Sequence, residues 1–167
     1  MHRTHGCGRR PPIRPGLSRD KKRLLRLSTL VFVVGTAVNY PWEVLQAPLY
    51  SGMESWRFVM WHCFRAAIGD GLLVLLIFAA AAATQRSLGW FRTPRAPAIV
   101  AVLVAGLALG VLVEWWGLNW ARRWTYSDLM PLVPGLGIGA VPILQILVLP
   151  PVVFWILSRH KMGGLDA

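Results

Sequence analysis

The sequence predicts an all-α integral membrane protein, a bundle of four transmembrane helices that are kinked at prolines. Of its 167 residues, 55% are hydrophobic and 15% are charged, against roughly 45–50% and 25% in soluble proteins. The charges are also unevenly placed. They leave four long stretches with few or no charged residues, as helices surrounded by lipid require.

The N-terminal part of the chain separates into a basic tail and a first helix. Residues 1–23 are rich in Arg, Pro and Gly and are predicted to be a disordered tail. The apolar stretch that follows is too long for a cleaved secretory signal. We predict the first helix at about 24–46, where Glu43 lies at the membrane boundary. Pro41 should kink this helix and Pro48 should end it.

Three further apolar stretches predict the remaining helices. The second is expected at about 60–83 and the third at about 97–120, where Pro97 suits a first-turn position. The fourth is expected at 135–157, within an uncharged run over 129–158. It contains Pro142, Pro150 and Pro151, whose freed carbonyls need other partners. Residues 159–167 complete the chain as a short tail.

Basic residues and tryptophans predict the orientation. Nine of the 18 Lys and Arg residues lie in the first 26 positions, which indicates a bacterial cytoplasmic (inner) membrane protein with both termini cytoplasmic. This distribution favours membrane lipids as partners and argues against nucleic acid. Trp90 and Trp155 fall at the inner interface. Seven tryptophans fall at the outer end, an excess that indicates more than interfacial anchoring: Trp42, Trp56, Trp61, Trp115, Trp116, Trp120 and Trp124.

Polar side chains in the first two helices form the first group of candidate site residues. Asn39, Glu43 and Gln46 fall within about 60° of arc and should face the bundle interior. Glu43 then serves as an acid, base or ligand; the alternative is a carboxylate solvated among head groups. In the second helix, His62 and Arg65 share a face and Asp70 lies about 80° from His62. His62 could relay protons, or Asp70 could form an ion pair with Arg65 or His62.

The third and fourth helices supply the second group. Gly106 and Gly110 permit close helix packing. Glu114 lies near the same face, roughly 9 Å inside the helix end, and should point toward a neighbouring helix as a functional or a structural acid. Gln145 is expected to hydrogen-bond Glu114 or Glu43. The following loop contains Arg122, Arg123, Trp124 and Tyr126, which either bind a phosphate or carboxylate or grip lipid head groups.

Several of these residues resemble a known family. Asn39-x2-Trp42-Glu43-x2-Gln46, His62-Cys63-x5-Gly69-Asp70, Glu114 and Trp124-x-Tyr126-Ser127 resemble small bacterial polytopic membrane proteins with four helices. The resemblance covers about 39–150 and implies a membrane protein, without implying a reaction. Pro41-Trp42-Glu43 is also similar to a motif of membrane-bound carotenoid enzymes of the lycopene cyclase type. The chain lacks their paired acids followed by phenylalanine, which argues against cyclase activity.

These observations lead to three functional hypotheses. The first is an enzyme that modifies a lipid or isoprenoid in the outer membrane half, with Glu43 and Glu114 as the acid–base pair and His62 or Asp70 tuning them. The second is a small oligomeric transporter or an accessory subunit of a membrane complex. The third is a protein that binds partner helices without catalysis. The histidines are too scattered for a three-His zinc site, whereas a carboxylate-rich metal site with one His stays open as an alternative. We assign no metal and no cofactor.

Overall fold

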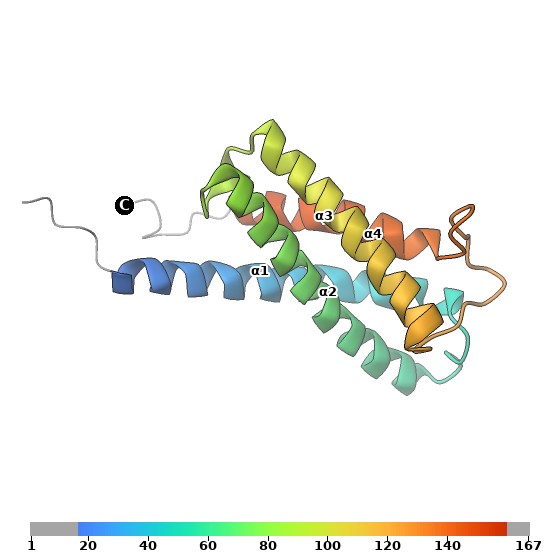
Figure 1. The fold of residues 1–167 in the computed structure, drawn as a ribbon. Coiled ribbons are helices and arrows are strands. Elements are labelled where there is room, and N and C mark those ends of the chain that lie inside the picture. Colours follow the sequence, from blue (N-terminus) through green and yellow to red (C-terminus); the bar gives the residue numbers. More distant parts are fainter. Residues whose placement is uncertain (1–16, 160–167) are drawn as a thin grey trace, which may run out of the picture.

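Four helices run up and down alternately along one bundle (Figure 1). The structure, a computed structural model, describes residues 17–159, so the predicted tail residues 1–16 and 160–167 lie outside the described part. The long helices are α1 (Leu17–Gln46), α2 (Trp56–Gln85), α3 (Ala96–Trp115) and α4 (Ala140–Arg159). Short elements follow the first three: η1 (Ala47–Leu49), η2 (Trp90–Arg92) and the π-helical η3 (Trp116–Trp120).

The helix starts that differ most from the predicted ones are those of α1 and α4. α1 begins at Leu17, so residues 17–23 are helical and do not belong to a disordered tail. Lys and Arg are good helix formers in water, and the apolar helix behind them provides the nucleus. α4 begins at Ala140 and not at Gly135, because Gly135 and Gly137 adopt positive φ angles of 78° and 65° in the preceding turn.

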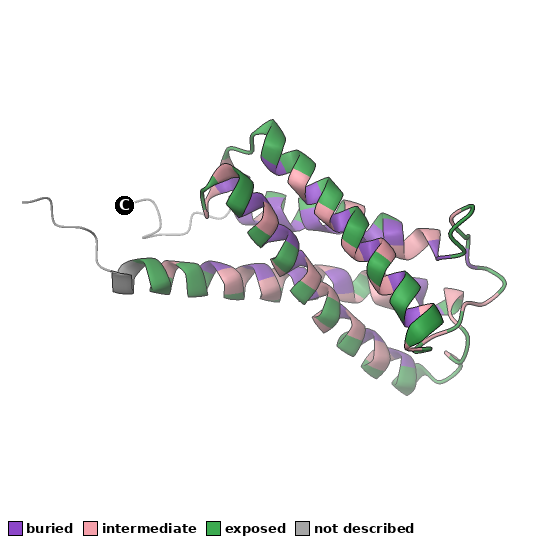
Figure 2. Cartoon of the chain, in the orientation of Figure 1, coloured by how far each residue is buried: buried purple, intermediate pink, exposed green. Residues whose placement is uncertain are grey.

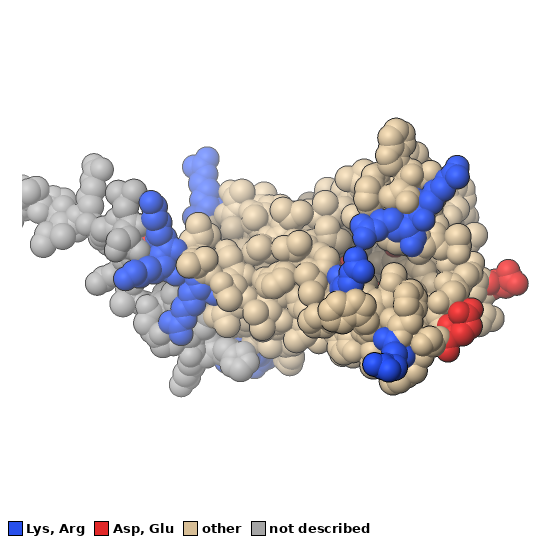
Figure 3. Space-filling view, turned by 90° about the horizontal axis from the view of Figure 1, so that it is seen from below, with Lys and Arg blue, Asp and Glu red and all other residues tan. Residues whose placement is uncertain are grey.

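All four helices are long and apolar enough to cross a membrane, which makes the chain a multi-pass membrane protein. On the face shown in Figure 3, the charged side chains gather at the two ends and leave an uncharged band between them. Large apolar side chains such as Leu76, Val104 and Trp155 are exposed along the helices. Figure 2 shows this exposed surface on the outward sides of the bundle. A lipid environment accounts for such exposure.

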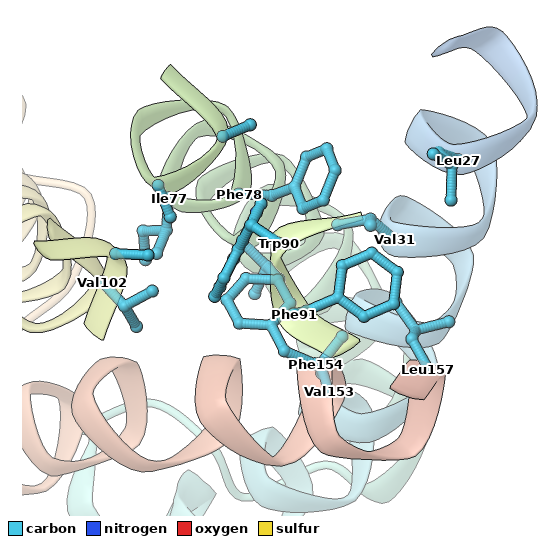
Figure 4. Close-up of a cluster of buried hydrophobic side chains, with 14 of the residues drawn as sticks. Leu27, Val31, Ile77, Phe78, Trp90, Phe91, Val102, Val153, Phe154 and Leu157 are labelled. Atoms are coloured by element: carbon cyan, nitrogen blue, oxygen red, sulfur yellow. The ribbon is translucent and has the colours of Figure 1, made fainter. Parts of the chain in front are cut away.

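One end of the bundle holds the apolar core (Figure 4). Phe78 of α2, Trp90 and Phe91 of η2, and Phe154 of α4 pack together there, with the rings of Trp90 and Phe154 4.9 Å apart in a T-shaped arrangement. Trp90 is only 3% exposed. The prediction of Trp90 as an interfacial residue is therefore wrong, because the loop after α2 folds back under the helices.

Two glycine contacts bring the helices close together near the middle of the bundle. A Cβ atom on Gly35 would lie 3.4 Å from the Cα atom of Gly71, so α1 and α2 touch along their backbones. A Cβ atom on Gly106 would lie 3.0 Å from the carbonyl oxygen of Ile146, and Gly110 packs against the side chain of Ile146. The second contact confirms the predicted close packing at Gly106 and Gly110.

The prolines lie inside continuous helices. α1 passes through Pro41, and α4 passes through Pro150 and Pro151. Pro150 has no N–H group to bond the carbonyl of Ile146, four residues earlier. That carbonyl faces the Cα atom of Gly106 in α3, where a weak Cα–H···O contact is available to it.

The end of the bundle opposite the apolar core is closed by paired loops. We call it the site end; it comprises the C-terminal ends of α1 and α3 and the N-terminal ends of α2 and α4. The loop after α1 pairs with the loop after α3: the N–H of Ser51 donates to the carbonyl of Thr125 (3.0 Å), and the N–H of Ser127 donates to the carbonyl of Leu49 (3.0 Å). These bonds fix the segment that contains Trp124 and Tyr126.

Candidate functional site

A cavity of about 530 Å³ lies between the four helices at the site end. This volume is in the range of small-molecule binding sites. The residues that line the cavity from α1 and α4 are all buried or half-buried. The exposed lining residues come only from α2 and from the end of α3: Arg65, Gly69, Trp116 and Arg123. The cavity therefore opens sideways, between α2 and the end of α3.

The amide of Gln145 is the centre of the polar network in this cavity. Its Nε2 lies 2.9 Å from Oδ1 of Asn39, 2.7 Å from Oε1 of Glu43 and 3.0 Å from Oδ2 of Asp70. Its Oε1 accepts a hydrogen bond of 2.8 Å from Nε2 of Gln46. A single amide thus joins side chains of α1, α2 and α4, and the glycine contacts next to Asp70 and Gln145 bring these helices within reach.

Glu43 and Asp70 form a carboxyl pair. Their side chains lie within hydrogen-bonding distance of each other, although they come from different helices. A hydrogen bond between two carboxyl groups requires a proton on one of them, because two adjacent carboxylates repel strongly in a medium of low dielectric constant. Nε2 of Gln46 also donates to Glu43 at 2.7 Å. The pair can therefore hold one exchangeable proton beside the cavity.

Glu114 belongs to a second group, formed by the end of α3 and the loop after it. The hydroxyl of Tyr126 donates to Oε2 of Glu114 and accepts a hydrogen bond of 2.7 Å from the N–H of Gly139. The ring of Trp124 packs directly on Gly117, where there is no room for a Cβ atom. The indole N–H of Trp124 is buried and lies close to the carboxyl group of Glu114 and the hydroxyl of Tyr126.

Two tyrosines near the carboxyl groups stay neutral. Burial, followed by the negative charges of Glu114 and Glu43, raises the pKa of Tyr50 far above its usual value. Burial, followed by the hydrogen bond to Glu114, raises the pKa of Tyr126. Both phenols are therefore protonated at neutral pH, and Tyr126 is a hydrogen-bond donor to Glu114.

The structure brings most of the predicted site residues together. Tyr126 contacts the cavity through Glu114. Ten other predicted site residues line it: Asn39, Glu43, Gln46, His62, Arg65, Asp70, Glu114, Arg123, Trp124 and Gln145. Gln145 bonds to Glu43, as one predicted alternative had it, and not to Glu114. The seven tryptophans divide into three groups. Four are more than half exposed, as an interfacial belt requires: Trp56, Trp61, Trp115 and Trp120. Trp116 and Trp124 line the cavity, and Trp42 is half-buried, with its indole N–H donating to Oε1 of Gln46.

One expected alternative for a charged residue is wrong. Asp70 forms no ion pair with Arg65 or His62 within the described part of the chain, because its face of α2 turns toward Glu43 and Gln145. Arg123 lines the cavity and Arg122 does not. Arg122 is exposed, with a backbone φ of 47°, and its expected role in binding an anion or lipid head groups stays a prediction.

Some lining residues were not predicted. Tyr50, Met53 and Trp116 border the cavity because the loop after α1 and the π-helical turn η3 fold over it. A π-helical turn at the end of a helix is frequent at functional sites, but its sequence, Trp-Gly-Leu-Asn-Trp, continues the α-helical pattern without a break. For Tyr50 the sequence contains one usable signal, because Gly52 indicates a turn that can fold the loop after α1 back over the helices.

Within residues 17–159, no three His, Cys, Asp or Glu side chains are grouped as metal ligands. The cavity presents carboxyl groups, a phenol and amides alongside apolar side chains. Comparisons of the chain with protein-family models, with curated proteins and with solved structures found no match.

Proposed function

We propose that this chain is an enzyme of the bacterial cytoplasmic membrane that carries out acid–base chemistry on a lipid or isoprenoid in the outer half of the bilayer. The single observation that carries the proposal is the cavity, in which carboxyl groups from three different helices, Glu43, Asp70 and Glu114, line a space of about 530 Å³. Acids at membrane depth are costly and are found where function requires them.

The orientation follows from the basic residues. Arg26, Arg86, Arg92 and Arg95 lie at the end of the bundle opposite the site. The basic end faces the cytoplasm by the positive-inside rule, so the cavity opens into the outer leaflet. The resemblance to small bacterial polytopic membrane proteins agrees with this placement, and the Pro41-Trp42-Glu43 likeness to carotenoid enzymes agrees with an apolar substrate.

The Glu43 and Asp70 pair and the carboxyl group of Glu114 have separate roles in the proposed chemistry. The proton shared by Glu43 and Asp70 is added to the substrate, which acts as the base. Glu114 accepts a proton from another atom of the substrate, with Tyr126 holding its Oε2 in place. One proton enters the substrate and one leaves it, so an isomerisation or bond migration of the substrate is balanced without another reactant. The proton gained by Glu114 then returns through water to the Glu43 and Asp70 pair, which restores the enzyme for the next turnover. The rings of Trp116 and Trp124 line the same cavity and would stabilise positive charge that develops in the substrate.

The test is untargeted mass spectrometry of lipid extracts from the native host with the gene deleted. The deletion strain would be complemented with wild type, Glu43→Gln, Glu114→Gln or the control Glu54→Gln at matched membrane levels. Glu54 is an exposed acid at the same end that does not line the cavity. We expect a lipid product that forms in the strains complemented with wild type and with Glu54→Gln. Its amount should be lower by about 10²-fold or more with Glu43→Gln and with Glu114→Gln.

Identical lipid profiles for the deletion strain and the wild-type complement would refute the enzyme proposal. They would favour the alternative of a small oligomeric transporter or an accessory subunit, in which the buried polar network binds a partner or a transported species. A normal profile with Glu114→Gln alone would remove the proposed role of Glu114 and keep that of the Glu43 and Asp70 pair.

A further inference from the structure

The opening of the cavity is basic although its floor is acidic. Arg65 on α2 and Arg123 after α3 are exposed lining residues of the cavity, and both lie close enough to His62 to act on its charge. Neither arginine forms an ion pair within the described part of the chain, even though three carboxyl groups line the same cavity. Those carboxyl groups are instead bound by Gln145, Gln46 and Tyr126. Two guanidinium groups are therefore left available at the rim.

The arginines and the acids lie at different depths. Arg65 precedes Asp70 by five residues on α2, which corresponds to about 7.5 Å along the helix axis. Arg65 lies on the side of Asp70 that is nearer to the helix end, where lipid head groups would be. A molecule held by the arginines would thus place the atoms just below its charged group against Asp70 and Glu43.

The opening also has a gap in its wall. Gly69 is exposed, lines the cavity between Arg65 and Asp70, and a Cβ atom placed on it would meet no atom within 4 Å. Apart from the two arginines, the other exposed lining residue is Trp116, directly after α3. Because this gap lies in the lipid-facing side of the bundle, a chain attached to a head group can pass through it from the bilayer.

We propose that the substrate is an amphiphile with a phosphate head group, bound by Arg65 and Arg123, which reaches the cavity sideways from the lipid between α2 and the end of α3 over Gly69. Two guanidinium groups bind a phosphate through charge-assisted and bidentate hydrogen bonds. The proposal deepens the proposed function by naming the substrate class. It places the reacting atoms in the first few bonds below the phosphate.

The experiment is native mass spectrometry of the full chain in a neutral detergent, titrated with hexadecyl phosphate. The uncharged hexadecylglycerol is the matched probe for the chain alone, and inorganic phosphate is the matched probe for the anion alone. We expect hexadecyl phosphate to bind to wild type much more tightly than either matched probe. Arg65→Gln and Arg123→Gln should each weaken its binding by about tenfold or more. Arg57→Gln, an exposed basic residue at the same end that does not line the cavity, should leave binding unchanged.

The gap at Gly69 has its own pair of variants. Gly69→Leu should weaken the binding of hexadecyl phosphate, whereas Gly69→Ala, whose Cβ atom meets nothing within 4 Å, should not. Circular dichroism of both variants would establish that they are folded. Equal loss of binding in Arg57→Gln and Arg65→Gln would overturn the proposal, since it would show general attraction to a basic surface. Inorganic phosphate that binds as tightly as hexadecyl phosphate would assign the arginines to a free anion and overturn the proposal. Binding of hexadecyl phosphate that is insensitive to Gly69→Leu would overturn sideways access.

This measurement does not involve turnover, so it fails or succeeds separately from the lipid profiles. Binding that depends on Arg65 and Arg123, together with unchanged lipid profiles, would support the phosphate amphiphile as a ligand and refute the proposed enzyme activity. A changed lipid profile, together with binding that is insensitive to substitution of both arginines, would support the enzyme activity and refute the phosphate head group as part of the substrate.

Discussion

Replacement of Gln145 by methionine tests whether the buried amide holds the bundle together. Methionine has a similar volume and removes the amide without leaving a large void. The two N–H groups and the carbonyl of the amide can form three hydrogen bonds at once, although four partners lie within 3.0 Å. Hydrogen bonds between helices in a membrane contribute about 0.6 to 1.7 kcal/mol each, so the loss should lower the free energy of unfolding by about 2 to 5 kcal/mol.

Gln85→Met is the matched control for this prediction. Gln85 also forms two hydrogen bonds of 3.0 Å, to the carbonyl of Thr93 and from the N–H of Arg95. These bonds are exposed, and water can replace both partners, so the change should cost about 1 kcal/mol or less. Unfolding would be followed by circular dichroism during titration of the purified protein with a denaturing detergent. A smaller loss for Gln145→Met than for Gln85→Met would refute the central role of the Gln145 amide.

Three further predictions follow from the glycine contacts and the tyrosines. Gly106→Ala should lower the thermal unfolding temperature, because its Cβ atom would meet the Ile146 carbonyl at 3.0 Å, at a cost of about 1 to 3 kcal/mol; Gly69→Ala, which has open space, should not lower it, and equal effects would contradict the contact. Tyr126→Phe should reduce the amount of lipid product by about tenfold or more while the protein stays folded, since Glu114 and the Gly139 N–H both lose a partner; full activity of Tyr126→Phe in the lipid extracts would show that Glu114 needs no such support. Tyr50 has a raised pKa in the folded protein, so its contribution to stability is complete below pH ~10 and is lost as the pH rises further; the unfolding temperature should therefore fall less steeply above pH ~10 in Tyr50→Phe than in wild type, and parallel curves would argue against a buried phenol.

The helices and their inward faces could be predicted from the sequence because both depend on local rules. Apolar length predicts a span, and a rotation of about 100° per residue places Asn39, Glu43 and Gln46 on one face. The same rotation places Glu114 near the Gly106 and Gly110 face, where the structure finds it buried. These predictions require no knowledge of how the helices pair.

The pairing of side chains between helices was not predictable, because it depends on where the helices cross. Asp70 had two cationic candidates on its own helix, yet it contacts Glu43 because Gly35 and Gly71 bring α1 and α2 together one residue away. No periodic pattern links Gly35 to Gly71 in the sequence. Tyr126 likewise reaches Glu114 only because a backbone turn reverses the chain after η3.

The proline in α4 makes one wall of the cavity compliant. Ile146 and Pro150 both line the cavity, and the helical hydrogen bond that would join them is absent. The aromatic core around Phe154 lies a turn further along α4 and holds the C-terminal half of the helix. The N-terminal half, which presents Gln145, is joined to it by one helical hydrogen bond fewer, so α4 bends more easily at this point. A bulky amphiphile would then be accommodated by a small change in the angle of one helix, without separation of the bundle.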